Sequence, residues 1–493
     1  MPALSVLDLA MFLLETPARP FNIAPLIILD PPPRVRAGFA DRLLKRMLKR
    51  PAGNPFNYRL HSPLLGAPSL EVDPTLDLSR HVHRLTLKAP GTLPQLFERL
   101  CEIHQKKLPR SRPLWEFYVI DGLEDGKVAL YGKMHHGIID GRTSVQVIAN
   151  WLSTSPTERT VRAMWEGVPR RSGKGAESAS IIDRLRRAIG LAAGTAVTTA
   201  SLYRMVAGQA LNTLSGGSGG NALMLPFTAI PNVLKGRFST KRSFAYCTLP
   251  LNELKALGKA HGVKLNDLML ATLDIGIDRY LQDLGKRPDK PLVLAMPVAL
   301  SAGAKGGNQI AILQFPLGAP GNSAKARLDQ IRAQTATVKD VVQRESSDTV
   351  MLFTTLVHGV PALLDNLGLK GGVPVSNLVF SNPFGLPEKQ YLMGAPVVLA
   401  LPLSVVNAGQ MLNITAVTLD DMLQLGFLAI PGAVPKVEKL AQFTREAFDE
   451  LKHALDGPAT AKAAVKRAPR LPRPAAKTAA PTVRRKRIAP VKA

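Results

Sequence analysis

The stretch from Met134 to Gly141 contains a histidine pair followed at fixed spacing by an aspartate, in the order His-His-Gly-Ile-Ile-Asp-Gly. Histidine is the side chain best suited to move a proton near neutral pH, so the pattern favours a general base for acyl transfer. Gly137 permits a tight turn at this point. The alternative is that His135 and His136 are ordinary loop histidines whose ring nitrogens are satisfied by backbone groups.

The elements on either side should position these histidines. Residues 128–134 have the composition of a strand, and Val145, Ile148 and Leu152 recur at helical spacing after the motif. Residues 117–120 predict a second strand, preceded by an amphipathic helix over 94–107 and joined to the histidine strand through a hairpin. We therefore expect the histidines at a strand-to-helix junction, where the strand end directs an imidazole into a cleft.

The N-terminal region predicts a strand over 21–30 and then a basic amphipathic helix. Apolar residues from Val35 to Leu48 recur at helical spacing, opposite Arg42, Lys45, Arg46 and Lys49. Such a helix packs on a sheet with a solvated charged face, or contacts a membrane through its basic face.

Length and composition predict a two-domain globular protein. The chain has 493 residues, too many for one ordinary core, and its 40 prolines and 39 glycines indicate a loop-rich architecture. The cysteines, Cys101 and Cys247, are too few for a disulfide framework and suit a reducing cytoplasm. The first residues lack a basic segment, and no long apolar run occurs, so neither a signal peptide nor a transmembrane helix is expected.

Changes in composition divide the chain into four segments. We predict an N-terminal domain over 1–153, a linker and helical crossover over 154–243, a C-terminal domain over 244–456 and a disordered tail over 457–493. The net charge is +26, and the tail contributes 11 Lys or Arg without a single Asp or Glu. This charge predicts attraction to phospholipid, to nucleic acid or to a phosphate-bearing molecule such as coenzyme A, and charge alone does not choose among them.

Further motifs follow in a fixed order along the chain, and together they carry a family resemblance. They are Pro113-Leu114-Trp115, the complete HHxxxDG pattern of 135–141, Asn266-Asp267 and Ser381-Asn382. Over residues 4–452 the chain resembles the bacterial wax ester synthase/diacylglycerol acyltransferase family, within the coenzyme A-dependent acyltransferases of the chloramphenicol acetyltransferase-like fold. The resemblance implies an α+β fold of two such domains, each a mixed sheet with flanking helices, and an active site at their interface.

The resemblance also assigns roles to residues. It implies that His136 is the catalytic base, that His135 supports it, and that Asp140, with Gly141 beside it, orders the loop. Asp267 can also cap the helix that follows it. The remaining motif positions are substrate or oxyanion candidates (Asn266, Asp267, Asn382) and a structural motif (Pro113, Leu114, Trp115).

The implied activity is O-acyl transfer from long-chain acyl-CoA to diacylglycerol, to a fatty alcohol or to both, with no covalent enzyme intermediate. The resemblance implies no cofactor, and we recognise no set of metal ligands at suitable spacing. We expect a cytoplasmic protein at the inner face of the membrane or on lipid inclusions, with the basic tail contacting anionic phospholipid or nucleic acid. Two alternatives stay open: another hydroxyl or amine acceptor on the same fold, and a non-catalytic scaffold on lipid droplets or nucleic acid.

Three stretches depart from the family pattern. Thr418-Leu419-Asp420-Asp421 stands where relatives usually have Ser-Tyr-Asp-Gly, and Pro383-Phe384 replaces a Val-Pro pair. Phe21-Asn22 occupies the place of an N-terminal histidine. These departures leave the preferred acceptor open and leave the base in place.

Overall fold

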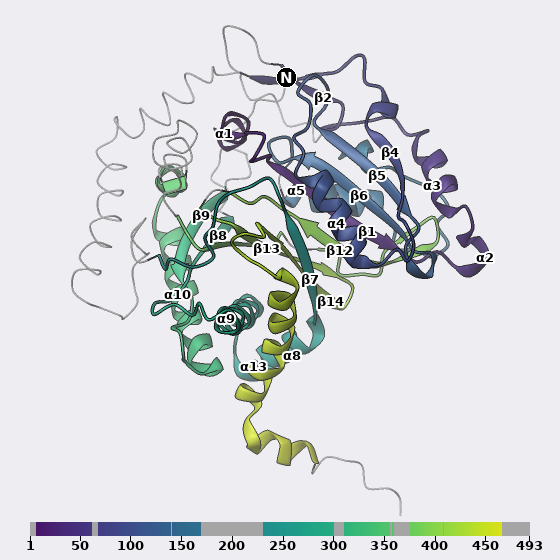
Figure 1. Cartoon of the computed structure of the whole chain (residues 1–493). Coiled ribbons are helices and arrows are strands. Elements are labelled where there is room, and N and C mark those ends of the chain that lie inside the picture. The colour runs from purple at the N-terminus through teal and green to yellow at the C-terminus, as the bar shows by residue number, and fades with distance from the viewer. Residues whose placement is uncertain are drawn as a thin grey trace, which may run out of the picture.

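The protein is described from a computed structural model of the whole chain, which forms two mixed β-sheets packed with helices (Figure 1). The described residues are 6–61, 68–139, 141–168, 230–299, 310–354, 357–358, 375–383, 385–407 and 409–465. Residues 169–229 of the predicted linker and most of the basic tail lie outside them.

The first sheet has six strands in the order β11-β12-β1-β6-β5-β4. Only the β4–β5 pair is parallel; the other pairs are antiparallel. The strands predicted over 21–30, 117–120 and 128–134 are confirmed as β1, β5 and β6. The bounds are β1 Asn22–Leu29, β4 Val82–Thr86, β5 Trp115–Asp121, β6 Val128–His135, β11 Tyr391–Leu392 and β12 Ala395–Leu403.

The second sheet also has six strands, in the order β7-β14-β13-β10-β8-β9, and β10 is parallel to both of its neighbours. A small hairpin of β2 (Tyr58–His61) and β3 (Ser69–Val72) stands apart. Both large sheets are mixed, as the predicted fold class requires. The bounds are β7 Ser243–Pro250, β8 Val293–Ala299, β9 Ile310–Pro316, β10 Leu378–Ser381, β13 Leu412–Leu419 and β14 Met422–Ala429.

Helices cover both sheets, and α8, α9, α10 and α13 gather beside the second sheet, where α13 runs out beyond the body (Figure 1). The helix predicted over 94–107 is confirmed as α4. The bounds are α1 Val6–Leu14, α2 Pro33–Arg36, α3 Phe39–Met47, α4 Leu93–His104, α5 Gly141–Trp151, α8 Leu251–His261, α9 Leu265–Asp283, α10 Ala324–Arg344, α11 Ser347–Thr354 and α13 Val437–Val465.

The basic helix predicted from Val35 to Leu48 is wrong as a single element. It is two helices, α2 and α3, separated by Gly38 in a left-handed backbone conformation with φ of 62°. A helix cannot continue through a residue with positive φ, so the chain turns there. The amphipathic pattern survives in α3, which buries Phe39, Leu43 and Met47 and leaves Lys45 and Arg46 exposed.

Strands from late in the chain complete the first sheet. β12 pairs with β1 along almost its whole length, from Ala24 opposite Leu403 to Leu29 opposite Val397. The first sheet therefore contains chain from the predicted C-terminal domain, a crossover that division of the sequence into consecutive segments did not anticipate. The domain bounds themselves stay a prediction.

β1 joins the hydrophobic cores on the two faces of its sheet. Leu26 and Ile28 belong to a large core that also contains α4 and the second sheet, while Ile27 and Leu29 belong to a core beneath α3 and α5. The alternation follows from the two-residue period of a strand. Both faces of β1 are buried, which explains its nearly continuous apolar sequence.

The centre of β1 also contains a local break in the ladder. Pro25 lies opposite Pro402 of β12, and the pairing of β1 with β6 passes from Ile23 to Leu26 without Ala24 or Pro25. Proline has no N–H to donate to a ladder, so the break occurs where the sequence places it. This part of β1 lines the cavity described below.

Candidate active site

The histidine pair lies where β6 ends, as the sequence predicts. His135 is the last residue of β6, and its N–H donates to the carbonyl of Leu114 at 3.0 Å. The N–H of His136 donates to the carbonyl of Phe21 at 2.7 Å, and a tight turn follows, closed by the N–H of Ile138 on the carbonyl of His135. Backbone bonds to two different segments thus hold both histidines in place.

His136 is half-buried and lines an apolar cavity of about 100 Å³ between the two sheets. β1 and β12 form one wall, α5 a second, and the chain around β10 and β13 the remainder. Both halves of the sequence therefore contribute to the cavity that contains the histidine. Its lining residues besides His136 are Ile23, Ala24, Pro25, Ile27, Gly141, Ser144, Val145, Ile148, Ser381, Pro383, Gly385, Leu386, Ala400, Leu401, Pro402, Leu403, Ser404, Thr415 and Val417.

One face of α5 is directed into this cavity. Gly141, Ser144, Val145 and Ile148 all line it, and their spacing of three and four residues places them on one side of a helix. A Cβ added to Gly141 would lie 3.2 Å from the Cβ of Pro383, so glycine permits the close approach of the two halves here. Asp140, the predicted loop-ordering residue, lies outside the described residues.

The His135 side chain is fully buried and tightly held. Its ring stacks on Phe12 with centroids 4.4 Å apart and planes 4° apart, and its Nδ1 accepts the N–H of Gly137 at 3.0 Å. On the other side of the ring, Nε2 lies 3.5 Å from Oε1 of Glu15. His135 is therefore fixed by α1 and the chain that follows it, consistent with a supporting neighbour.

Sequence reasoning missed Glu15. Its other carboxylate oxygen lies 3.0 Å from Nζ of Lys107 and 3.1 Å from a guanidinium nitrogen of Arg110. Burial alone would raise the pKa of this carboxyl, but His135 and Lys107 outweigh it and hold the pKa at about 2. A signal was present, because Glu15 is the one acidic residue between Asp8 and Asp30.

The Pro113-Leu114-Trp115 motif supports the histidine turn through its backbone. Trp115 is buried, its indole N–H donates to the carbonyl of Phe56 at 2.7 Å, and its ring stacks on Trp165 and on His81. Leu114 supplies the carbonyl that accepts the His135 N–H. The motif thus contributes packing and one anchoring acceptor, and none of its three residues lines the cavity.

Asn22, which stands near the place of the family's N-terminal histidine, ties β1 to the end of α4. Its side-chain amide donates to the carbonyls of His104 and Lys106, at 2.7 and 2.9 Å. In β1 it lies opposite His135. The buried Asn22 side chain therefore connects β1 to the end of α4 beside the histidine turn.

His104 links the two halves beside the cavity. Its Nε2 lies 2.9 Å from the carbonyl of Ser404, which can only accept, so Nε2 carries the proton and Nδ1 accepts from the Tyr131 hydroxyl at 2.7 Å. Burial lowers the pKa of His104 to about 3, so the ring is neutral at neutral pH. Both ring nitrogens are occupied, which assigns His104 a structural part.

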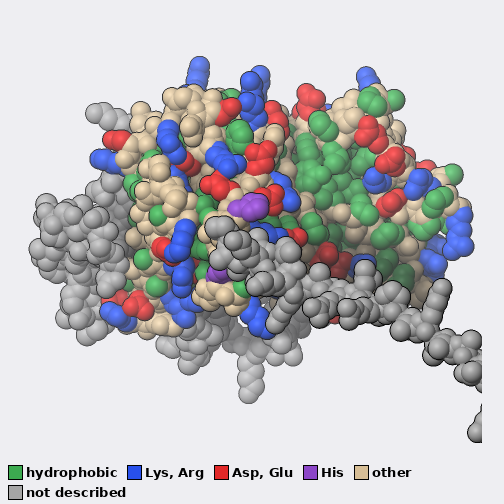
Figure 2. All heavy atoms as spheres, turned by 90° about the horizontal axis from the view of Figure 1, so that it is seen from below, with side chains coloured by type: hydrophobic (Ala, Val, Ile, Leu, Met, Phe, Trp, Pro, Cys, Tyr) green, Lys and Arg blue, Asp and Glu red, His purple; other side chains and the backbone are tan. Residues whose placement is uncertain are grey.

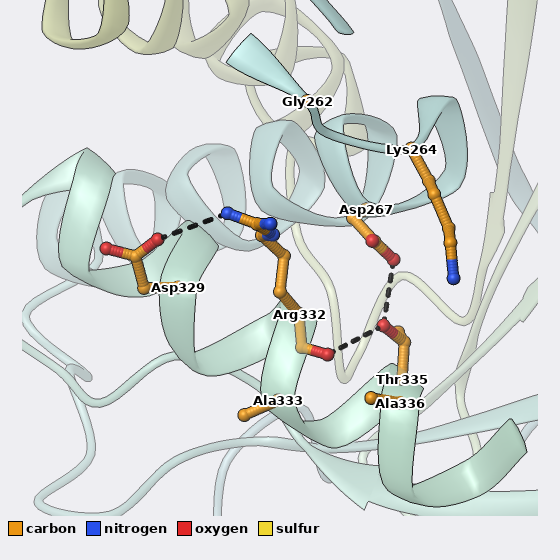
Figure 3. Close-up of a pocket in the computed structure, with 8 residues that line it drawn as sticks. All are labelled: Gly262, Lys264, Asp267, Asp329, Arg332, Ala333, Thr335 and Ala336. Atoms are coloured by element: carbon orange, nitrogen blue, oxygen red, sulfur yellow. Dashed lines mark hydrogen bonds and ion pairs between the residues drawn. The ribbon is translucent and has the colours of Figure 1, made fainter. Parts of the chain in front are cut away.

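Asn266 and Asp267 lie elsewhere, in the first turn of α9. Asp267 lines a charged pocket of about 340 Å³ between α9 and α10, together with Lys264, Asp329, Arg332 and Thr335 (Figure 3). The expectation that Asp267 caps α9 is wrong: Lys264 is the N-cap residue, and the Asp267 carboxylate accepts from the Thr335 hydroxyl at 2.8 Å. Desolvation raises the pKa of this carboxyl.

Asn382 is the one substrate candidate beside the histidine cavity. It follows β10, and its neighbours Ser381 and Pro383 both line the cavity. Asn266 and Asp267 do not line it. The structure therefore brings Asn382 towards His136 and separates the Asn266-Asp267 pair from it.

The two residues that follow Pro383-Phe384 contact the departure at 418–421. The Leu386 N–H donates to the carbonyl of Thr418 at 2.8 Å, and the Asp420 N–H donates to the carbonyl of Leu386 at 2.9 Å. A Cβ on Gly385 would lie 2.1 Å from that same Thr418 carbonyl oxygen, so only glycine fits there. Gly385 and Leu386 also line the cavity, so the departure at 418–421 contacts residues of its wall.

Within the described ranges, no group of three or more His, Cys, Asp or Glu side chains could hold a metal ion. Of the helices in that same part of the chain, none has the length and apolarity needed to cross a bilayer.

Solved structures with the same arrangement define the class of fold. The wax ester synthase/diacylglycerol acyltransferase from Marinobacter aquaeolei VT8 superposes with a TM-score of 0.67 at 23% identity, over 92% of this chain and all of that one. The first condensation domain of the CDA synthetase superposes with a TM-score of 0.53 at 15% identity, over 91% of this chain and 96% of that domain. The two-sheet fold is thus the one that these two proteins share with this chain.

Sequence comparison identifies the family. Residues 4–269 match the wax ester synthase/diacylglycerol acyltransferase catalytic domain, and residues 306–452 match the WS/DGAT C-terminal domain. The probable diacylglycerol O-acyltransferase Tgs4 of Mycobacterium tuberculosis is 32% identical over 92% of this chain and 96% of its own length. A putative diacylglycerol O-acyltransferase of the same organism is 31% identical over 92% of this chain and all of its own. The chain belongs to the wax ester synthase/diacylglycerol acyltransferase family and is an acyltransferase.

Proposed function

We propose that the protein transfers a long-chain acyl group from acyl-CoA to the hydroxyl of diacylglycerol, of a fatty alcohol or of both, with His136 as general base. The observation that carries this proposal is the position of His136 on the wall of an apolar cavity built from both halves of the chain. Such a cavity accommodates acyl chains, and an imidazole on its wall can reach a hydroxyl at its polar end. The names of the relatives point to the same donor and acceptors.

The chemistry requires one proton carrier. A neutral imidazole nitrogen of His136 accepts the proton of the acceptor hydroxyl while the hydroxyl oxygen attacks the thioester carbon. The tetrahedral intermediate then collapses, the carbon–sulfur bond breaks, and the imidazolium returns the proton to the departing thiolate. The products are an ester and free coenzyme A, and no bond to the enzyme forms.

Negative charge on the thioester oxygen needs hydrogen-bond donors. Asn382 is the candidate that the geometry favours, because its two neighbours line the cavity that contains His136. Its side-chain amide can donate to an oxyanion. Asn266 and Asp267 are less suited to this part, since they border the separate pocket between α9 and α10.

The apolar part of the cavity is where an acyl chain would lie. Ile23 and Ile27 on β1, Ala400 on β12, and Val145 and Ile148 on α5 present aliphatic surface to it. Burying a methylene group stabilises a bound chain by about 0.8 kcal/mol. The methylene groups that enter the cavity of about 100 Å³ would each gain this stabilisation.

The same proposal includes contact with a lipid surface. On the face drawn in Figure 2, hydrophobic side chains gather in a patch beside charged ones. Val35 in α2 and Leu48, the residue after α3, are exposed, and so are Arg34, Lys45 and Lys49 nearby in the sequence. Apolar side chains among cations suit an anionic lipid surface. Flotation with vesicles of anionic lipid tests this: K45E/K49E should float less than wild type, and equal flotation would exclude this surface.

A second candidate function is acyl transfer to a different acceptor. The observation that favours it is the contact of Leu386, which lines the cavity, with Thr418 and Asp420 in a stretch that departs from the family pattern. An altered wall beside the base changes which hydroxyl or amine can approach it.

The experiment is acyl transfer by the purified protein. Radiolabelled palmitoyl-CoA is offered with diacylglycerol or with hexadecanol, and the products are separated by thin-layer chromatography. We expect labelled ester from the wild type and from His453→Ala, whose side chain is exposed on α13, and none from His136→Ala. Ester from His136→Ala at the wild-type rate would eliminate His136 as base. Absence of ester with both acceptors, from folded protein, would favour another acceptor.

A further inference from the structure

The neighbour of the proposed base is held in one tautomer. Nδ1 of His135 accepts the N–H of Gly137, so in the neutral ring the proton is on Nε2. That Nε2 faces Oε1 of Glu15 at 3.5 Å, and neither atom has a hydrogen bond within the usual distance. The side chains are 0% and 1% exposed, so water is excluded from both.

A buried N–H and a buried carboxylate oxygen that face each other form an incomplete hydrogen bond. A buried polar group without a partner destabilises the folded protein, and this favours a shorter contact between the two atoms. Hydrogen bonds in unliganded active sites are often long and shorten when substrate binds.

The surroundings of Glu15 keep its carboxylate ionised. Lys107 and Arg110 approach its other oxygen, and Arg110 also donates to the carbonyl of Phe12, the residue whose ring stacks on His135. A carboxylate is costly to bury unless cations and hydrogen bonds compensate it, and an apolar side chain would satisfy packing alone. The sequence nevertheless has a carboxylate at this position.

We propose that Glu15 is a positioning residue for acyl transfer: it holds His135 with its proton on Nε2, and His135 in turn fixes the turn that presents His136 to the cavity. The inference rests on the proposed function of His136. The path is short, because the Gly137 N–H bonded to the His135 ring belongs to the residue that directly follows His136. Loss of Glu15 frees the ring to rotate or to change tautomer, and the turn loses its acceptor for that N–H.

The first test is Glu15→Gln, which preserves the shape of the side chain and removes its charge. We expect kcat to fall by about tenfold, the scale of a slightly misplaced catalytic group, with KM for both substrates within about twofold. The matched control is Glu71→Gln, because Glu71 also faces a histidine, with Oε1 3.7 Å from Nδ1 of His61, at an exposed site on the β2–β3 hairpin. Glu71→Gln should retain wild-type kcat. Unchanged kcat in Glu15→Gln would overturn the proposal.

A double-variant comparison shows whether Glu15 acts through His135. In His135→Asn the amide can still accept from Gly137 but cannot reach Glu15, whereas in His135→Gln the amide can donate to Glu15 but not accept from Gly137. Glu15→Gln should leave kcat unchanged in both backgrounds. In His135→Asn the acceptor for the Gly137 N–H does not depend on Glu15, and in His135→Gln that acceptor is already lost. A further loss of kcat in either background would show that Glu15 acts by another route and overturn the proposal.

A readout independent of turnover separates this inference from the proposed function. Nitrogen-15 NMR of labelled histidine, with the His135 signal identified by its absence in His135→Asn, reports the tautomer directly. We expect the Nε2–H form in the wild type and a mixture in Glu15→Gln. A single Nε2–H tautomer in both proteins overturns the positioning role even if His136→Ala is inactive. Full activity of His136→Ala eliminates the base and leaves the tautomer result to decide on Glu15.

Discussion

Two motifs of the family lie at comparable places in the fold and in opposite surroundings. His136 lies in the turn between β6 and α5, and Asp267 lies in the first turn of α9, so both are polar residues near the start of a helix. His136 borders an apolar cavity to which both halves of the chain contribute. Asp267 borders a pocket of Lys, Arg and Asp side chains that comes only from the C-terminal half.

The two surroundings distinguish the proposed site of acyl transfer from a site with a structural role. A base must meet two substrates in a place shielded from water, and a cavity between two sheets provides that place. The Asp267 carboxylate instead bonds across to α10, where it holds two helices together. A polar motif near a helix start thus does not define a reaction centre by itself. The segments that pack against the motif determine whether it borders an apolar cavity or a charged pocket.

The largest expected effect tests this separation with conservative variants at both positions. His136→Ala and His136→Gln should each lower kcat at least about 100-fold, since neither replacement can accept and return a proton. Asp267→Asn should retain kcat within about threefold, because its amide oxygen still accepts from Thr335. Initial rates with palmitoyl-CoA measure all three. An active His136→Gln, or an Asp267→Asn as inactive as His136→Ala, would contradict the assignment of acyl transfer to the His136 cavity and of a structural role to Asp267.

An intermediate effect sharpens the description of the apolar cavity. Val145 is half-buried on the cavity face of α5, so Val145→Phe should fill part of the space and lower kcat/KM for palmitoyl-CoA about tenfold, a loss of about 1.4 kcal/mol. For octanoyl-CoA, kcat/KM should fall by less than about twofold, because a shorter chain occupies less of the cavity. Gln146→Phe, at the adjacent exposed position, is the control and should leave both values unchanged. Equal losses for both chain lengths would place the acyl chain elsewhere.

The smallest effect concerns the charge of Asp267. The pKa of Asp267 is raised in the folded protein, so the carboxyl ionises less readily there than in the unfolded chain. The protein is therefore more stable at a pH below the pKa of the unfolded chain, where this carboxyl is protonated, than at a pH above the pKa of the folded protein. Asp267→Asn removes that ionisation and should raise the free energy of unfolding at pH 7 by less than about 1 kcal/mol. The gain should disappear as the pH falls below about 3.8, the ordinary value for an Asp carboxyl. Urea unfolding at several pH values measures it, and a variant less stable than wild type at pH 7 would contradict the sign.

The local elements of the fold were largely predictable from sequence. The apolar runs of β1 and β6 and the spacing of α4 and α5 reproduce the predicted strands and helices, because each pattern reflects burial on one or both faces of a single element. The break at Gly38 was missed, since the apolar spacing continues across it. The membership of β12 in the first sheet could not be predicted, because a strand's sequence does not specify its partner.

The candidate site was predictable in part. The spacing of His135 and His136 and their place at a strand end are properties of one short segment, and both are confirmed. The Asn266-Asp267 pair was grouped with the histidines only because the family's motifs occur in this order along the chain. The structure places this pair in a different pocket from His136. Glu15 was missed because its partner is 120 residues away along the chain.

The sequence by itself determined the candidate proton carriers, the strand and helix that flank them, and the family to which the chain belongs. These features depend on residue types and short spacings, which are local. The tertiary structure alone decided that β12 closes the cavity against β1, that Glu15 faces His135, and that Asp267 bonds to α10. Each of these contacts joins segments far apart in the chain, and only the packing of the two sheets and their helices brings such segments together.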